Sequence, residues 1–278
     1  AISISATGTV TVNGTLSATG SGNASGGGCG SGGSINITAV TLAGSGTISA
    51  NGGKETGGGG FGGGGGRISL NGVTTDNFAG TLQANGGTVI ATQGYAGTIY
   101  LNAGRRANLV LGGSGNLASL RLGTDDTPSS YTFGTITIQT GGTLEMDSNI
   151  YLNSNNGGSA TLNVTTLDVQ TGGILKADGL GFPAGAGPGK SITSYDGGSY
   201  GGKGGDYGAN GTIGPTYGSA TNPIYLGSGG ISGAGGGAII ISATGTVTIN
   251  GTLSTTGDGT GGGGCGSGGS INITAVTL

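Results

Sequence analysis

Residues 1–42 read AISISATGTVTVNGTLSATGSGNASGGGCGSGGSINITAVTL, and residues 238–278 read AIIISATGTVTINGTLSTTGDGTGGGGCGSGGSINITAVTL. The two stretches are nearly identical, and their equivalent cysteines, Cys29 and Cys265, are 236 residues apart. This spacing predicts a long tandem repeat, one full copy of which fills the sequence. We expect the sequence to be a window on a longer array of such repeats.

A shorter repeat lies inside the long one. Pairs of aliphatic residues with one residue between them recur at intervals of 33, 33, 31, 37, 26, 77 and 32 residues: Ile2/Ile4, Ile35/Ile37, Ile68/Leu70, Ile99/Leu101, Ile136/Ile138, Leu162/Val164, Ile239/Ile241 and Ile271/Ile273. A Gly-Thr-aliphatic segment follows most of these pairs, at residues 14–16, 46–48, 80–82, 142–144 and 251–253. Gly173-Ile174-Leu175 is a variant of that segment.

The alternation of apolar and polar residues is typical of short β-strands. It places Ile2, Val10 and Leu16 on one side of the chain and Ser3 and Thr9 on the other. Three such strands per repeat, separated by Asn-Gly and Gly-Gly turns, predict one coil of a parallel β-solenoid. The fold class is therefore all-β, a parallel β-helix of about 32 residues per coil, in which stacking places aliphatic side chains on one another.

Glycine accounts for 74 of the 278 residues and concentrates in runs at the ends of the coils, at residues 26–33, 57–66 and 261–269. Because each run follows the same strand of its coil, we expect the glycine-rich arms to leave the solenoid at one corner. There they would lie side by side in an extended conformation, since only glycine permits such close backbone approach. The alternative is a set of flexible loops.

The sequence divides into three segments. The pattern of residues 1–178 predicts β-solenoid coils, and that of residues 238–278 predicts the beginning of the next long repeat of the same solenoid. Residues 179–237, which lie between them, are an insertion rich in Gly, Tyr and Pro. The insertion holds four of the five prolines and five of the nine tyrosines: Tyr195, Tyr200, Tyr207, Tyr217 and Tyr225. Such tyrosines indicate a contact surface. Three alternatives follow for the insertion: it packs on its own or a neighbouring solenoid, it binds a ligand or carbohydrate, or it is a mobile loop.

Composition excludes several classes of function. The net charge is −3, with 8 basic and 11 acidic residues and no basic cluster, so we expect no nucleic-acid partner. No apolar run approaches the roughly 18 residues of a membrane span. Histidine, the commonest general base and metal ligand, is absent, and we expect neither a cofactor nor enzymatic activity.

Three groups of residues are candidates for chemistry. Cys29 and Cys265 are too far apart along a rod to pair with each other, so each either forms a disulfide with another rod or serves as a small side chain among glycines. Glycosylation sequons occur at Asn13, Asn23, Asn36, Asn163, Asn210, Asn250 and Asn272, several of which also fit Asn-Gly turns. Arg105, Arg106, Arg121, Asp125 and Asp126 form the best patch for a polysaccharide-degrading enzyme, although a solvated loop explains it as well.

The string GGSINITAVTLAGSGTISANGG at residues 32–53, with GGGGFGGGGGRISL at residues 57–70, resembles glycine-rich tandem-repeat proteins of prokaryotic surfaces and secretions. It is also distantly similar to the β-helical shafts of filamentous-haemagglutinin-type adhesins. The resemblance covers residues 27–97 and 238–278. It implies a right-handed parallel β-helix, an extracellular or cell-surface location, structural or adhesive work and no cofactor.

The sequence thus leads to two main hypotheses. The first is a structural segment of an extracellular fibre, sheath or surface layer, whose partner is another copy of itself, either head to tail or side by side. The second is an adhesin or glycan-binding module that uses the Tyr-rich insertion to contact cell-surface glycans. Ice binding through the outward threonines is a minor variant, because Ser, Asn and Gln interrupt those rows.

Overall fold

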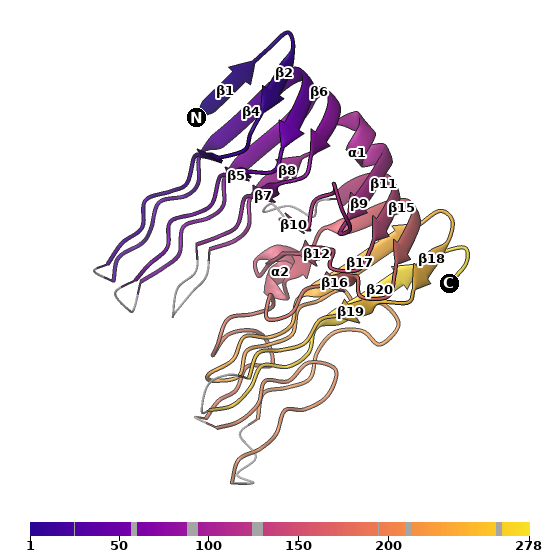
Figure 1. The fold of residues 1–278 in the computed structure, drawn as a ribbon. Helices are drawn as coiled ribbons and strands as arrows, with labels where there is room; N and C mark the ends of the chain where they lie inside the picture. The colour runs from indigo at the N-terminus through magenta and orange to yellow at the C-terminus, as the bar shows by residue number, and fades with distance from the viewer. Residues whose placement is uncertain are drawn as a thin grey trace.

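The computed structural model describes residues 1–24, 26–56, 60–87, 94–123, 130–193, 195–208, 213–259 and 263–278. The protein is all-β apart from two short helices, α1 (Ala103–Ala107) and α2 (Leu152–Asn155). Its strands stack turn upon turn in parallel sheets (Figure 1), and among the described strands the one antiparallel pair is β13 (Ser148–Asn149) with β14 (Gly158–Ser159). The prediction of a parallel, solenoid-like β-fold is confirmed at this level.

The first stack of turns has two sheets. The larger has the order β1-β4-β6-β8, with β2 also pairing with β4: β1 (Ile2–Ser5), β2 (Thr9–Thr11), β4 (Ser34–Gly44), β6 (Arg67–Phe78) and β8 (Thr98–Tyr100). The smaller has the order β3-β5-β7: β3 (Thr15–Ser17), β5 (Thr47–Ser49) and β7 (Thr81–Gln83).

The second stack repeats this plan. Its larger sheet has the order β20-β17-β15-β11-β9, with β18 pairing with β15: β9 (Asn108–Leu111), β11 (Ser130–Ile138), β15 (Thr161–Val169), β17 (Ala238–Ala243), β18 (Val247–Ile249) and β20 (Ser270–Thr274). Its smaller sheet has the order β10-β12-β16-β19: β10 (Ser119–Leu122), β12 (Thr143–Met146), β16 (Ile174–Lys176) and β19 (Thr252–Ser254).

The pairing register brings equivalent aliphatic residues of successive turns together. Ile2 pairs with Ile35, Ile35 with Ile68 and Ile68 with Ile99, at the intervals of 33, 33 and 31 residues found in the sequence. One continuous core of buried aliphatic side chains runs through both stacks, from Ile35 to Val247. Each fully buried Ile or Leu contributes about 1.5–3 kcal/mol of burial free energy, so the turns are held together chiefly by this column.

One part of the sequence alignment is wrong. The repeat pattern predicts that Ile136 and Ile138 share a row with Ile99, but they pair with Leu109 and Leu111 in the next row along the turn. The residues of β11 that pair with Leu162 and Val164 are Tyr131 and Phe133, and Leu162 then pairs with Ile241, not Ile239. The reason is that β11 is a single strand of 9 residues that runs through both rows. It contains two pairs of alternating apolar residues, Tyr131/Phe133 and Ile136/Ile138, and the period of two residues alone does not tell which pair belongs to which row.

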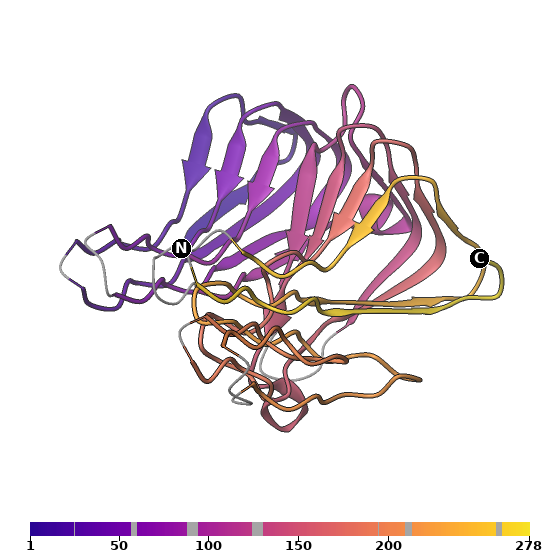
Figure 2. The same ribbon diagram turned by 90° about the horizontal axis from the view of Figure 1, so that it is seen from below.

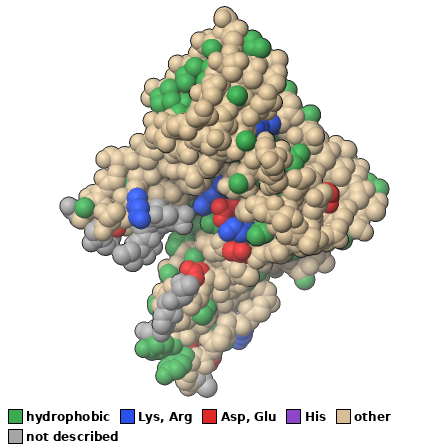
Figure 3. All heavy atoms as spheres, in the orientation of Figure 1, with side chains coloured by type: hydrophobic (Ala, Val, Ile, Leu, Met, Phe, Trp, Pro, Cys, Tyr) green, Lys and Arg blue, Asp and Glu red, His purple; other side chains and the backbone are tan. Residues whose placement is uncertain are grey.

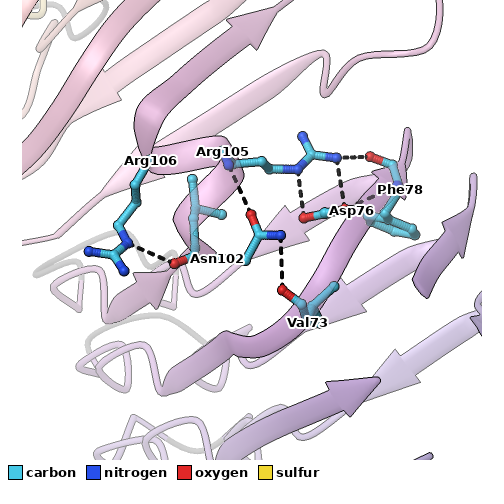
Figure 4. A network of polar contacts seen from close by, with 7 residues as sticks. Val73, Asp76, Phe78, Asn102, Arg105 and Arg106 are labelled. Atoms are coloured by element: carbon cyan, nitrogen blue, oxygen red, sulfur yellow. Dashed lines mark hydrogen bonds and ion pairs between the residues drawn. The ribbon is translucent and has the colours of Figure 1, made fainter. Parts of the chain in front are cut away.

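Helix α1 lies where the two stacks meet, against β6, β9 and β11. Asn102 caps it by accepting a hydrogen bond from the Arg105 N–H at 2.9 Å and donating to the Val73 carbonyl at 3.1 Å. The Arg105 guanidinium donates to both carboxylate oxygens of Asp76, at 2.6 and 3.0 Å, and to the Phe78 carbonyl (Figure 4). These contacts tie the first residues of the second stack to the sheet of the first.

Glycine-rich arms leave the turns after the strands of the smaller sheets. Each arm is closed at its base by the same hydrogen bond, in which the amide of the last arm residue donates to the carbonyl of the first, at 2.6–2.8 Å: Gly33 to Ala18, Gly66 to Ala50, Gly97 to Ala84, Gly237 to Ala177 and Gly269 to Thr255. The arms form two blocks rather than the single predicted set (Figures 1 and 2). The reason is that two successive turns differ from the others: only residues 123–129 connect β10 to β11, and the turn after β12 carries the compact β13–α2–β14 segment in place of an arm.

Within a block the arms approach one another backbone to backbone. Gly32 donates to the Gly64 carbonyl and Gly65 to the Tyr95 carbonyl, both at 2.8 Å. A Cβ atom at Gly66 would lie 1.9 Å from the Gly33 carbonyl oxygen, and one at Gly52 would lie 1.9 Å from that of Gly63. Glycine is therefore required at these positions because the neighbouring backbone leaves no room for a side chain. This supports the prediction of packed arms over flexible loops.

The described residues of the insertion build an enlarged arm of the second block. The hydrogen bond from Gly237 to Ala177 closes its base. Its segments form backbone hydrogen bonds to one another and to the arm of residues 255–269. Gly198 donates to the Cys265 carbonyl at 2.9 Å and Gly236 to the Ser267 carbonyl at 2.8 Å. The described residues of the insertion thus pack against a neighbouring arm of their own chain, which agrees with one of the outcomes expected from the sequence.

We predict that Gly66→Ala lowers the free energy of unfolding by about 1–3 kcal/mol, because the added methyl overpacks a backbone contact that cannot yield cheaply. Urea unfolding monitored by circular dichroism measures the change. Gly201→Ala is the matched control, since its Cβ would meet nothing within 4 Å. Equal stability of the two variants would contradict the packed-arm account.

Candidate functional site

A row of charged residues crosses the second smaller sheet, between the two blocks of arms. Arg121 of β10 is in register with Glu145 of β12, which is in register with Lys176 of β16. The Arg121 Nε lies 3.8 Å from Glu145 Oε2, Arg121 Nη2 lies 3.1 Å from Asp147 Oδ1, and Lys176 Nζ lies 3.7 Å from Glu145 Oε1. Figure 3 shows blue and red side chains gathered in the hollow at the middle of this face.

Asp147 is the centre of this charged row. It accepts hydrogen bonds from the Ala96 amide at 2.5 Å and from its neighbour Ser148 at 2.9 Å, besides its ion pair with Arg121. The Ala96 contact joins the first arm block to the second stack, because Ala96 belongs to the first block and Asp147 directly follows β12 of the second stack. Asp147 therefore links the second smaller sheet to the first block of arms.

A small cleft of about 80 Å³ lies beside the row, lined by Tyr95, Arg121, Ser148, Gly179 and Pro183 among others. Arg121 and Ser148 both line this cleft, and their buried Nε and Oγ atoms have no hydrogen-bond partner among the described residues. A cleft of this volume is large enough for a water molecule.

Sequence reasoning found Arg121 but missed its partners. Asp125 and Asp126, the carboxylates expected beside it, lie outside the described residues. Glu145 and Lys176 follow the Gly-x-Leu segments of successive turns, so their alignment was a signal in the sequence that could have found them. Arg105 pairs with Asp76, and Arg106 donates to the Leu101 carbonyl and lies over the Tyr100 ring, 4.7 Å from its centroid, so neither belongs to the row.

The insertion tyrosines divide into an inner and an outer pair. Tyr200 and Tyr217 meet edge to face with ring centroids 4.9 Å apart. The Tyr200 hydroxyl bonds to Ser270 Oγ at 2.7 Å, and the Tyr217 hydroxyl bonds to Ser228 Oγ at 2.8 Å and donates to the Leu226 carbonyl. Burial raises the pKa of Tyr217 well above its usual value. This half-buried pair anchors the insertion.

The outer pair is exposed. The Tyr195 and Tyr207 rings lie 4.8 Å apart and are 55% and 66% exposed. The buried Asp196 holds their loop together, since it accepts a hydrogen bond from the Tyr207 amide at 2.7 Å. Cys265 borders the same surface, whereas Tyr225 is half-buried elsewhere and its carbonyl accepts from Ser270 Oγ. Of the five tyrosines, then, two form an outward contact surface.

The cysteines and sequon asparagines are dispersed. Cys29 is half-buried in the first block, Cys265 is exposed in the second, and both are free thiols. Asn13, Asn36 and Asn250 are exposed, and Asn23 and Asn163 are half-buried. Asn272 is half-buried and donates to Asn222 Oδ1 at 2.8 Å, and Asn210 lies outside the described residues.

Comparisons of the chain with protein-family models, with curated proteins and with solved structures give no match. Among the described residues there is no helix of the length and apolar character needed to cross a membrane. The case for function therefore depends on the geometry of this chain.

Asp178 lies at the base of the insertion arm and joins it to the next turn. Its carboxylate accepts hydrogen bonds from Ser254 Oγ at 2.5 Å and from the Thr256 amide at 2.8 Å. Burial raises the pKa of Asp178, but these two hydrogen bonds, with help from Lys176, outweigh burial and lower the pKa below its usual value. The ionised form is thus favoured in the folded protein.

We predict that Asp178→Asn lowers the free energy of unfolding by less than about 1 kcal/mol at pH 7, because solvent screens the partly exposed carboxylate. Because the pKa is lowered on folding, this stability is present above the unfolded-state pKa of about 3.9 and is lost as the pH falls through the folded-state value. Urea unfolding at several pH values should show the variant and the wild type converging in acid. A difference that is independent of pH would refute the role of the charge.

Proposed function

We propose that this chain is a stretch of a right-handed parallel β-helix, with about 32 residues per coil, that serves as a structural part of an extracellular fibre, sheath or surface layer. The observation that supports the proposal best is the recurrence of one pairing. Ile2 pairs with Ile35 near one end of the stack, and Ile239 pairs with Ile271 near the other, in the two stretches that are nearly identical in sequence. Two equivalent coils therefore use the same strand pairing.

This recurrence suits a rod built from repeated turns. Parallel strands in a sheet are about 4.8 Å apart, so every added turn lengthens the rod by that amount. Each turn contacts its neighbours along the stack, which is the behaviour of a solenoid whose length follows from the number of repeats. The resemblance of residues 27–97 to repeats of prokaryotic surface and secreted proteins points to the same use.

The internal chemistry also favours a structural role. Arg121, Glu145, Lys176 and Asp147 are mutually paired, and the glycine arms are engaged in hydrogen bonds to one another. The exposed thiol of Cys265 suits a disulfide to another rod in an oxidising exterior. Side-by-side rods could be joined in this way.

The direct test is fibre diffraction and negative-stain microscopy of material from the native source. A stacked solenoid predicts elongated particles and a strong axial reflection near 4.8 Å. Compact particles without that reflection would reject the structural proposal.

The second candidate function is glycan binding, and the Tyr195 and Tyr207 pair is the observation that favours it. Two exposed rings on a glycine-rich loop provide a broad amphipathic surface of the kind that sugars contact. Asp206 borders the same surface and adds a hydrogen-bond acceptor.

A glycan-array experiment with Tyr195→Ala, Tyr207→Ala and the double variant separates this function from the first. If the surface binds glycans, each variant should lose at least about tenfold in affinity, and Tyr151→Ala, which changes an exposed tyrosine elsewhere, should lose none. Binding that the double variant retains in full, or no binding by the wild type, would leave the adhesive function without support.

A further inference from the structure

The outer pair of Tyr195 and Tyr207 is held together by the backbone of a single loop. Gly197 donates to the Gly205 carbonyl at 2.9 Å, and the Tyr207 amide donates to Asp196 Oδ1 at 2.7 Å. These contacts bring the two limbs of the loop together and leave the ring centroids 4.8 Å apart. The pair is therefore complete within this loop and needs no other turn of the protein to form.

The separation of the two rings suits a covalent link. Two phenol rings joined by a carbon–carbon bond between their ortho positions have centroids only slightly closer than those of Tyr195 and Tyr207. Rings that are already in contact couple readily, because folding has made the encounter that two separate phenols would need. Both side chains are more than half exposed, so an oxidant can reach them and the rings are free to turn as they couple.

The composition of the chain leaves tyrosine and cysteine as the side chains most open to one-electron oxidation. Tryptophan and histidine are absent, and the single methionine, Met146, is fully buried. Cys265 borders the outer tyrosine pair. Its thiol would return an electron and a proton to a tyrosine radical unless the cysteine is itself in a disulfide.

The inner pair of tyrosines is a comparison within the same insertion. The Tyr200 and Tyr217 centroids are 4.9 Å apart, which is nearly the same separation. Their hydroxyl groups bond to Ser270 and Ser228. Burial raises the pKa of Tyr217 well above its usual value, so its proton is harder to remove. The outer pair has no hydroxyl hydrogen bond within the described part of the chain, so access and not distance distinguishes the two pairs.

We propose that Tyr195 and Tyr207 form an oxidative cross-linking site, at which a haem peroxidase with hydrogen peroxide joins the two rings. Each phenol loses one electron and one proton, and the two radicals form a carbon–carbon bond between their ortho carbons. The hydrogens on those carbons then move to the oxygens and restore both phenols. The peroxide accepts the two electrons and two protons and is reduced to two molecules of water.

The inference rests on the proposed structural role, since an extracellular fibre is open to such oxidants and gains from covalent links that need no thiol. The cross-link would fix the two limbs of the loop to each other and reduce the conformational freedom of its tip. A fibre without the cross-link would still be a stacked solenoid. The axial reflection of native material therefore judges the structural proposal separately from the cross-link.

The test is oxidation of the dilute 278-residue chain by a haem peroxidase and hydrogen peroxide, followed by mass spectrometry before and after trypsin digestion. Trypsin cuts after Lys203, between the two tyrosines, so residues 191–203 stay joined to residues 204–278 only if a cross-link connects them. The wild type should lose two hydrogen atoms and yield the joined peptide. Tyr195→Phe and Tyr207→Phe, which keep the ring but not the phenol, should each lower that yield at least about tenfold.

Tyr200→Phe is the matched control, because a link within the inner pair would join the same two peptides. It should keep the full yield, and Cys265→Ser should keep or raise it, since the nearby thiol is removed. A joined peptide that survives Tyr195→Phe would place the link elsewhere, and no joined peptide in the wild type and in Cys265→Ser would show that the pair does not couple. Either result overturns the proposal, as does native material whose digest contains residues 191–203 only as a free peptide.

Discussion

The structure depends on how closely one turn of backbone can approach the next. In the strands this approach is the ordinary spacing of a parallel sheet, and side chains project away from it. In the arms the chains also contact one another sideways, at distances that leave no room for a Cβ. The carbonyl of Gly33 occupies the place where a side chain at Gly66 would be, and that of Gly66 does the same at Gly97. Because glycine has no side chain, segments that lack apolar side chains can still pack closely against one another, backbone to backbone.

This constraint explains why the arms form blocks. An arm alone would be a long loop with unpaired amides, which is costly unless water or another chain satisfies them. Beside a neighbouring arm its amides and carbonyls find partners, and the base hydrogen bond, as in Gly33 to Ala18, holds the two ends of the arm at the stack of turns. Where a turn has no arm, the block ends, and Asp147 in that turn ties the second stack to the first block by its bond to Ala96.

The sequence predicted the parts of the fold that repeat. The row of Ile2, Ile35, Ile68 and Ile99 and the row of Gly-Thr-aliphatic segments appear in the sheets as expected, because period and spacing determine which residues pair. It failed at β11, where one strand carries two identical patterns. The sequence did not predict α1 or the partners of Arg121. Both depend on contacts between turns of unequal length, which a regular spacing does not reveal. The exposed pair of tyrosines could not be separated from the buried pair, because all five share the same Gly-rich surroundings.

Amide hydrogen exchange at the arm bases, followed by NMR, tests the central claim most directly. If the arms are packed backbone to backbone, the amides of Gly33, Gly66, Gly97, Gly237 and Gly269 should exchange as slowly as those in the middle of β4 and β15, since both would open only with a whole turn. Exchange at the rate of an unstructured glycine-rich chain, with the strand amides still protected, would show that the arms are loops and would contradict the account.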